Sequence, residues 1–301
     1  MILIRLRIIL MFSKAARHAL LAAGLCAAAL LSGCGALTGA SDTDPRAAVA
    51  SFYPLAWVTE QVAGDDWTVT NLTTPGGEPH DLELSIGATA DLTEADLVVY
   101  LEGFQPAVDD GIATAAEGTV LDAADHVRLR EGDPHFWLDP MLMVGLTVSV
   151  ADALAALDPD GAAAYRARAD ELVAELEDLD QQYVEGLADC QRDVVVVSHD
   201  AFGYLARYGM QFEPIAGLSP DAEPTPATLA SLADLIEFDG VITVFSERLA
   251  SPAMAETLAA DLGVGTAVLD PFEGLIDQTA GQDYLSLMRD NLAALEKANG
   301  C

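Results

Sequence analysis

Residues 194–208 of this chain, Val-Val-Val-Val-Ser-His-Asp-Ala-Phe-Gly-Tyr-Leu-Ala-Arg-Tyr, contain the pattern that most clearly indicates the type of fold. The four consecutive valines predict a strand that is buried on both faces, which is typical of parallel sheets. A polar turn with His199 follows at once, and a helix is predicted from Phe202 to Tyr208. A strand, a turn with a polar side chain and a helix together form the repeating unit of an α/β protein.

The same alternation of strands and helices extends along the rest of the chain. Apolar runs that predict strands lie at residues 47–52, 68–72, 97–101, 119–122, 194–198, 211–215, 241–245 and 266–269. Helices are predicted at residues 55–63, 84–94, 107–116, 202–208, 226–238, 252–262 and 284–297. This order predicts an α/β fold of two lobes, each with a mainly parallel sheet and flanking helices.

A segment of different character separates the two lobes. Residues 158–161, Asp-Pro-Asp-Gly, end one helix, and residues 162–187 contain no proline. Apolar side chains at three- and four-residue spacing predict that residues 162–187 form one amphipathic helix of roughly 40 Å. These side chains are Leu172, Leu176, Leu179 and Tyr183. We therefore expect an N-terminal lobe at residues 46–160, a rigid linker helix at residues 161–189 and a C-terminal lobe at residues 190–301.

The first 33 residues have the features of a secretory signal: four basic residues, no acidic residue and an apolar run from Ala19 to Leu31. The run is short for a spanning helix, which needs about 20 apolar residues. Leu31-Ser-Gly-Cys34 resembles a bacterial lipobox, which predicts a signal peptide at residues 1–33, a diacylglycerol anchor in the membrane on Cys34 and a polar tether at residues 34–45. The alternative is an ordinary signal peptide with an incidental cysteine. A start at Met11 would also leave a complete signal.

The charge of the chain excludes some classes of partner. Without residues 1–33, 10 basic residues remain against 48 acidic ones, which gives a net charge of about −38. Nucleic acids and anionic lipid surfaces are bound through basic patches, so neither is expected to bind this surface. The acidity is typical of a soluble, self-repelling protein outside the cell, and we expect a monomer.

Two cysteines follow Cys34, namely Cys190 and Cys301. In an exported protein an isolated pair of cysteines predicts a disulfide bond. Two free thiols are the alternative. Metal ligation by these cysteines is not expected, because neither lies in a Cys-x-x-Cys or Cys/His spacing.

Three of the five histidines lie in short turns rich in Pro and Asp. His80 follows the strand predicted at residues 68–72, His199 follows the strand at residues 194–198, and His135 lies between Asp133-Pro134 and Asp139-Pro140. Ligands of open parallel sheets bind beyond the carboxyl ends of the strands, so these imidazoles are expected to form a metal site there. His126 has no such setting, and we expect it on the surface.

A carboxylate is expected to complete this site. Asp270 directly follows the strand predicted at residues 266–269, and with three imidazoles it would make a closed tetrahedral site suited to Zn(II). One alternative is that Asp270 caps the segment that follows it, Pro271-Phe272-Glu273. Glu247 is the competing carboxylate. Together with Asp81 and Asp200, Glu247 is also a candidate to orient the imidazoles from outside the set of ligands.

At these residues the chain resembles the zinc/manganese class (cluster A-I) of solute-binding proteins of ABC importers, and within it the zinc branch. The motifs that carry the resemblance are Glu-Pro-His-Asp at 78–81, Asp-Pro-His-Phe-Trp-Leu-Asp-Pro at 133–140, Ser-His-Asp-Ala-Phe-Gly-Tyr at 198–204 and Leu-Asp-Pro at 269–271. The resemblance covers nearly the whole mature chain. It implies that His80, His135, His199 and Asp270 bind a transported Zn(II) ion, and that a rigid linker helix limits lobe movement. The His/Asp-rich loop of many zinc members is missing, since the first two ligands have only His126 between them.

The resemblance implies a lipid-anchored protein on the outer side of a bacterial membrane that delivers Zn(II) to an ABC permease and catalyses no reaction. His199 stands where the manganese branch typically has Glu, which favours zinc, and manganese import by the same class is the main alternative. A zinc hydrolase would need an open coordination position and a general base, and the chain has no His-Glu-x-x-His helix. An adhesin-type surface lipoprotein would share the anchor, but it would not account for the ligands.

Overall fold

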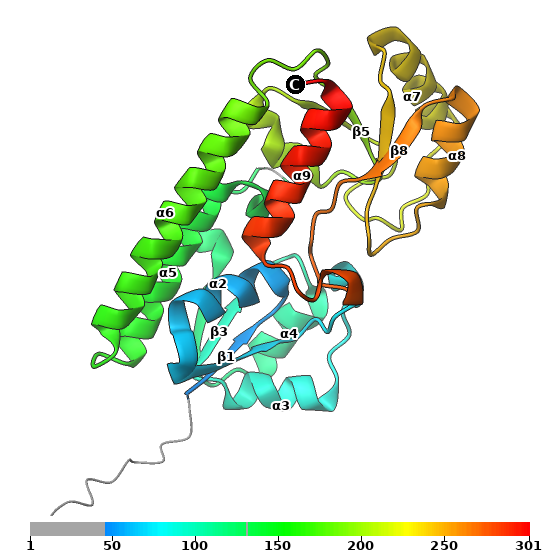
Figure 1. Cartoon of the computed structure of the whole chain (residues 1–301). Coiled ribbons are helices and arrows are strands. Elements are labelled where there is room, and N and C mark those ends of the chain that lie inside the picture. The colour runs from blue at the N-terminus through cyan, green and yellow to red at the C-terminus, as the bar shows by residue number, and fades with distance from the viewer. Residues whose placement is uncertain (1–45, 131) are drawn as a thin grey trace, which may run out of the picture. The chain divides into compact units, whose positions relative to one another are not determined.

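The computed structural model describes residues 46–130 and 132–301, so the predicted signal peptide, Cys34 and the tether lie outside the described residues (Figure 1). The N-terminal lobe has a parallel sheet with the strand order β2-β1-β3-β4. Its strands are β1 (Arg46–Ala50), β2 (Trp67–Asn71), β3 (Leu97–Tyr100) and β4 (Thr119–Asp122). Its helices are α2 (Tyr53–Ala63), α3 (Ile86–Glu94), α4 (Pro106–Ala115) and α5 (Pro140–Leu157).

The C-terminal lobe repeats this plan with the strand order β6-β5-β7-β8, again fully parallel. Its strands are β5 (Val194–Val197), β6 (Gln211–Pro214), β7 (Thr243–Ser246) and β8 (Gly265–Val268). Its helices are α7 (Pro226–Asp239), α8 (Ala253–Leu262) and α9 (Tyr284–Asn299), and residues 202–208 form a 3₁₀ helix where the sequence predicted a helix without specifying its type. Every strand predicted from the sequence is present, with ends within two residues of those expected.

The strand order of each sheet reverses direction beside its first strand. The chain passes from β1 to β2 on one side and then returns past β1 to β3 on the other, and β5, β6 and β7 follow the same path. The carboxyl ends beside such a reversal are where α/β proteins bind ligands. Ala50 pairs with both Asn71 and Val99, so the carboxyl ends of β1, β2 and β3 lie at one edge of the sheet.

The linker helix α6 (Ala162–Gly186) joins the lobes and packs along α5 (Figure 1). At 1.5 Å per residue its 25 residues span about 37 Å. Arg168 donates hydrogen bonds to the carbonyl oxygens of Val62 and Ala63 at the end of α2, and Tyr183 donates one to the carbonyl of Met288 in α9. One helix is therefore bonded to both lobes, which agrees with the rigid linker that the sequence predicts.

The two sheets contribute to one continuous apolar core. This core contains buried side chains of the first sheet, such as Val99, and of the second, such as Val197 and Phe245. Trp137 lies in the same core and is fully buried. Helix α5 is the one described helix with the length and hydropathy of a membrane span, but its buried residues place it inside this core.

A disulfide bond joins Cys190 to Cys301, as the isolated pair of cysteines predicted. Cys190 lies between α6 and β5, and Cys301 follows α9, so the bond fastens the end of α9 beside the second sheet. The peptide N–H groups of Gln191 and Arg192 also donate to the carbonyl of Asn299, which holds the same two segments together.

Candidate metal centre

The three histidines singled out by the sequence lie together between the two sheets. His80 is in a single 3₁₀ turn after β2, His135 precedes a 3₁₀ turn that leads into α5, and His199 follows β5. Their Nε2 atoms and a carboxylate oxygen of Glu273 all lie within 4.8 Å of one another. The expected meeting of three imidazoles beyond the strand ends is therefore present in the structure.

The turn that holds His80 is short and is fixed at its start. Pro79 begins the turn, and the carboxylate of Glu78 accepts a hydrogen bond from the backbone N–H of His80 at 3.2 Å. The buried side chain of Gln105 donates a hydrogen bond to the carbonyl of Pro79, also at 3.2 Å. The His80 ring then lies edge-on to Phe104, with 4.7 Å between the ring centroids.

The other two imidazoles are each oriented by a carboxylate. Nδ1 of His135 is 2.8 Å from Oδ1 of Asp133, which also accepts the backbone N–H of His135. Nδ1 of His199 is 2.9 Å from Oε1 of Glu247, and that oxygen accepts a second hydrogen bond from Ser198. A carboxylate on Nδ1 holds the proton there and leaves the Nε2 lone pair free for a metal ion.

Glu273 is the acidic member of the cluster. Its carboxylate oxygens lie 3.1 Å from Nε2 of His135, 3.5 Å from Nε2 of His80 and 3.6 Å from Nε2 of His199. Zinc bonds of 2.0–2.1 Å in a tetrahedron separate neighbouring ligand atoms by about 3.3 Å. These three spacings lie on both sides of that value, and all four ligand atoms lie within 4.8 Å of one another, so the ligand atoms would need to draw together around an ion.

These ligand atoms are buried and yet have no hydrogen-bond partner. His135 and His199 are fully buried, and Glu273 is 2% exposed. The three Nε2 atoms and Oε1 of Glu273 are among the few buried side-chain atoms without a hydrogen bond in the described residues. Buried polar atoms are nearly always satisfied, so four that converge on one point indicate a site for a cation.

The electrostatics of the cluster agree with this interpretation. Burial on its own would raise the pKa of Glu273, but its contacts with His135, His199 and His80 outweigh burial and hold that pKa well below its usual value. Burial on its own would lower the pKa of His199, yet its contacts with Glu247 and Glu273 raise it to about 10. In the metal-free protein Glu273 is therefore ionised and the His199 imidazole carries a bound proton. A metal ion that binds the imidazoles would displace this proton.

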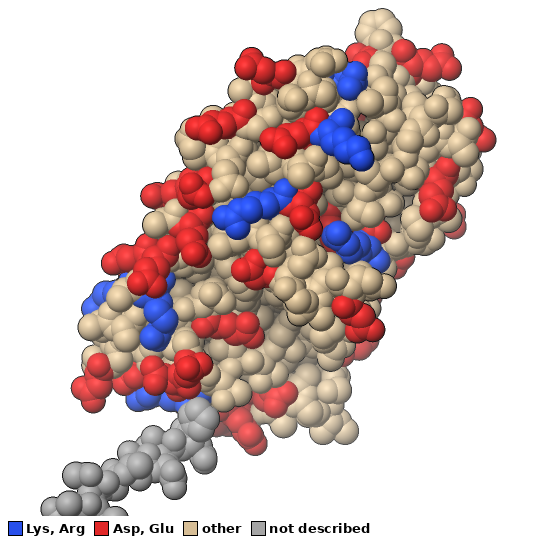
Figure 2. Space-filling model, viewed as in Figure 1, with Lys and Arg blue, Asp and Glu red and all other residues tan. Residues whose placement is uncertain are grey.

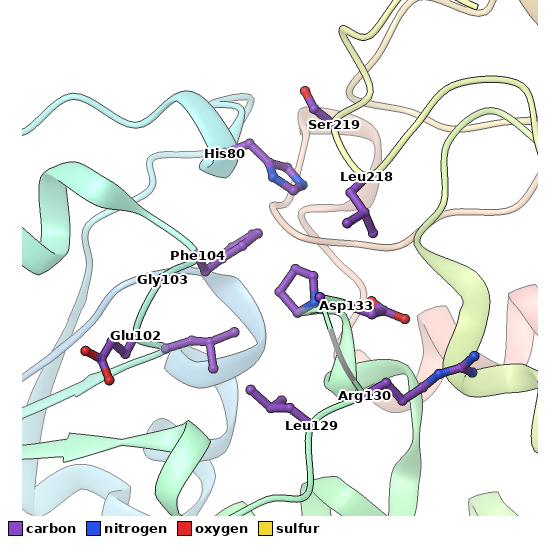
Figure 3. Close-up of a pocket in the computed structure, with 12 residues that line it drawn as sticks. His80, Glu102, Gly103, Phe104, Leu129, Arg130, Asp133, Leu218 and Ser219 are labelled. Carbon is purple, nitrogen blue, oxygen red and sulfur yellow. The ribbon is translucent and has the colours of Figure 1, made fainter.

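His80 is the ligand residue nearest to solvent. Its side chain is 14% exposed, and it lines a pocket of about 370 Å³. In Figure 3 the side chains of His80 and Phe104 from the first lobe and Leu218 from the second point toward the same space. The other three ligand residues do not line this pocket. The cluster is therefore reached from solvent on the His80 side.

The structure corrects the expected fourth ligand from Asp270 to Glu273. Both carboxylate oxygens of Asp270 are engaged elsewhere: Oδ1 accepts the N–H of Phe272 at 3.0 Å, and Oδ2 pairs with Arg248 at 2.7 Å. Asp270 is therefore outside the group of ligand atoms, while Glu273, three residues later, lies inside it. Asp270 instead caps the segment that follows it, which was the alternative role expected from the sequence, because it accepts the N–H of Phe272.

The residues proposed to orient the imidazoles fare differently. Glu247 contacts His199, in agreement with that prediction. Asp81 is exposed, and Asp200 makes no described side-chain hydrogen bond to a histidine, so adjacency in sequence was misleading for both. Asp133 takes this role for His135 instead, and an Asp two residues before a buried polar residue is a recognisable Asx-turn signal. His126 is exposed, as expected.

Three imidazoles and one carboxylate between two parallel-sheet lobes define a metal-binding protein of the solute-binding class. The chain belongs to the ZnuA family, zinc-uptake complex component A, periplasmic, whose model matches residues 48–298. This is a family of binding proteins and not of enzymes, and it agrees with the resemblance to the zinc branch seen in the sequence.

Individual relatives support the same assignment. The high-affinity zinc uptake system protein ZnuA of Bacillus subtilis is 32% identical over 89% of this chain and 93% of its own length. The zinc-binding lipoprotein AdcA of Streptococcus pneumoniae is 37% identical over 83% of this chain, which spans only 55% of AdcA. The crystal structure of the Zn(II)-bound ZnuA-like domain of that AdcA superposes with a TM-score of 0.76, at 36% identity over 85% of this chain and 99% of that domain.

Proposed function

We propose that this protein captures Zn(II) outside the cytoplasm and delivers it to the permease of an ABC importer. One observation carries the proposal: four buried, unsatisfied ligand atoms from His80, His135, His199 and Glu273 lie within 4.8 Å of one another. A set of four protein ligands leaves no open position for a substrate or water, which is typical of sites that hold zinc without doing chemistry on it. A hydrolase would need that position.

The ligand set favours zinc over manganese. Imidazole is the ligand that suits zinc, whereas manganese prefers oxygen ligands and a higher coordination number. The oriented Nδ1 atoms of His135 and His199 fix two imidazoles before the metal arrives. Because His80 is the one ligand residue that borders the pocket, we propose that the ion enters and leaves on that side.

Delivery requires a membrane-bound partner, and we propose that this chain is held near it by a lipid on Cys34. The tether at residues 34–45 then precedes the N-terminal lobe at residues 46–160, the linker at 161–189 and the C-terminal lobe at 190–301. Cys34→Ala should move the protein from the membrane fraction to the medium or periplasmic fluid. An unchanged distribution would contradict the anchor and leave the metal site untouched.

The test of the main proposal is metal content followed by competition. The protein starting at residue 35 is purified without a tag, analysed for bound metals, and titrated with Zn(II) against Mn(II). One tightly held zinc that manganese displaces poorly is the expected result. A preference for manganese would contradict the assignment of zinc as the metal. If the protein held no metal and no metal raised its melting temperature, the assignment of the metal site would be wrong.

A further inference from the structure

The ligand Glu273 follows a residue in an unusual backbone conformation. Phe272 has φ = 39° and is the one non-glycine residue with positive φ in the described part of the chain. A bulky side chain rarely adopts this left-handed region, and such strain persists only where the surroundings enforce it. Because Phe272 directly precedes Glu273, its backbone conformation sets the position from which the Glu273 side chain extends.

The surroundings that enforce this turn centre on Asp270. Its Oδ1 accepts the N–H of Phe272 at 3.0 Å across the turn, and its Oδ2 is held by Arg248 at 2.7 Å. The buried side chain of Asn291 in α9 accepts the N–H of Asp270 at 3.0 Å and donates to its carbonyl at 2.6 Å. Both oxygens and both backbone groups of Asp270 are thus fixed by named partners.

Two further contacts hold the same turn from the core side. The carbonyl of Pro271 accepts a hydrogen bond from the indole of Trp137 at 2.9 Å. The ring of Phe272 is buried and lies edge-on to Tyr284, whose hydroxyl donates to the carbonyl of Trp137. Because Trp137 lies two residues after His135, the turn of one ligand is bonded to the segment of another.

We propose that Asp270 is a positioning residue for zinc binding: by capping Phe272 it holds the left-handed turn that directs the Glu273 carboxylate between the three imidazoles. Asp270 does not touch the metal. It acts before the metal arrives, by keeping the backbone before the fourth ligand in the conformation that the site needs. This inference rests on the proposed zinc-binding function and adds the residue that sets the geometry of its fourth ligand.

The test compares variants that keep or remove the cap. Asp270→Ala removes it, whereas Asp270→Asn and Asp270→Ser keep a side-chain oxygen that can accept the N–H of Phe272. Asp158→Ala is the matched control. Like Asp270, Asp158 pairs with an arginine, Arg46, and it also accepts a hydrogen bond from the hydroxyl of Tyr165. Zinc affinity is measured by competition, and the visible absorption of bound Co(II) reports the ligand geometry.

Asp270→Ala should weaken zinc binding by about 10- to 100-fold, the range seen when residues that support metal ligands are lost. Its Co(II) spectrum should change, and the Asn and Ser variants should recover both properties in part. Asp158→Ala should change neither. Should Asp270→Ala fail to fold, Arg248→Gln provides the same two readouts, since that arginine is partly exposed and outside the core.

Normal affinity in Asp270→Ala, or weakened affinity with an unchanged Co(II) spectrum, would overturn the positioning role. Failure of the wild-type protein to bind zinc is a separate result, which would overturn the proposed function first. Binding by the wild type with no effect of the variants would leave the function intact and remove only this inference.

Discussion

Oε1 of Glu273 lies 3.1 Å from Nε2 of His135, and the two buried atoms nevertheless form no hydrogen bond. The glutamate comes from the loop after β8 and the histidine from the turn before α5. The pair is close enough for both atoms to bind one zinc ion. In the metal-free protein this contact helps to lower the pKa of Glu273, and a zinc ion bound to both atoms would replace it.

The buried histidines should dominate zinc affinity. His135→Ala and His199→Ala each remove a ligand and leave a carboxylate, Asp133 or Glu247, without its partner. Each should weaken binding well over tenfold, which is more than about 1.4 kcal/mol. Competition titration measures the loss. His126→Ala is the control and should bind like wild type, because His126 is exposed and outside the cluster. Equal losses in all three variants would contradict the ligand assignment.

Glu273→Gln tests the corrected fourth ligand. The amide keeps the size of the side chain but loses the charge and the negative ligand oxygen, so zinc affinity should fall more than about tenfold. The exposed Glu256 gives a matched control, and Glu256→Gln should leave affinity unchanged. If Glu273→Gln bound zinc normally, the carboxylate would not be a ligand.

Zinc binding should release protons and weaken in acid. The contacts of His199 with Glu247 and Glu273 raise its pKa to about 10 in the metal-free protein, so this imidazole is protonated at neutral pH. Zinc binds only the neutral imidazole, and lowering the pH therefore favours the proton over the metal. Calorimetry in buffers with different protonation enthalpies measures the protons released. Binding without proton release and with constant affinity between pH 6 and 8 would refute this electrostatic picture.

Removal of the disulfide should cost stability without changing the ligands. Replacing Cys190 and Cys301 by serine releases a cross-link between residues 111 apart in sequence. Losses of about 2–4 kcal/mol in the free energy of unfolding are typical of such bonds. Denaturant titration of the metal-free protein measures the change. An unaltered midpoint and slope would mean that the backbone bonds to Asn299 hold this end of α9 without the disulfide.

Much of the fold follows from local patterns. The run Val194–Val197 is typical of a strand buried on both faces, and the apolar spacing of residues 162–187 is typical of a long helix with one buried side. Three of the ligands were also predictable, since histidines are scarce and these stand at strand ends or between two Asp-Pro steps. The rule that ligands bind beyond the carboxyl ends of parallel strands indicated His80 and His199, and the two Asp-Pro steps indicated His135.

The choice between Asp270 and Glu273 was not predictable from the pattern. Both acids lie in one loop after β8, and the residue nearer to the strand satisfied the positional rule. The deciding feature is the positive φ of Phe272, which turns the chain so that the second acid, and not the first, faces the imidazoles. No propensity assigns such a conformation to a phenylalanine, because only the surrounding hydrogen bonds and core contacts maintain it.

Acidic side chains are spread over the face of the protein shown in Figure 2, among far fewer basic ones. A surface of this kind gathers a cloud of counter-ions, in which zinc competes with every other dissolved cation. The acidic surface would thus attract cations without selectivity, whereas the buried ligands would select the metal. High salt would screen the acidic surface and slow the arrival of zinc, while the affinity of the buried cluster would change little. The acidic surface would therefore affect how fast zinc is captured, and the buried cluster would determine which metal is held.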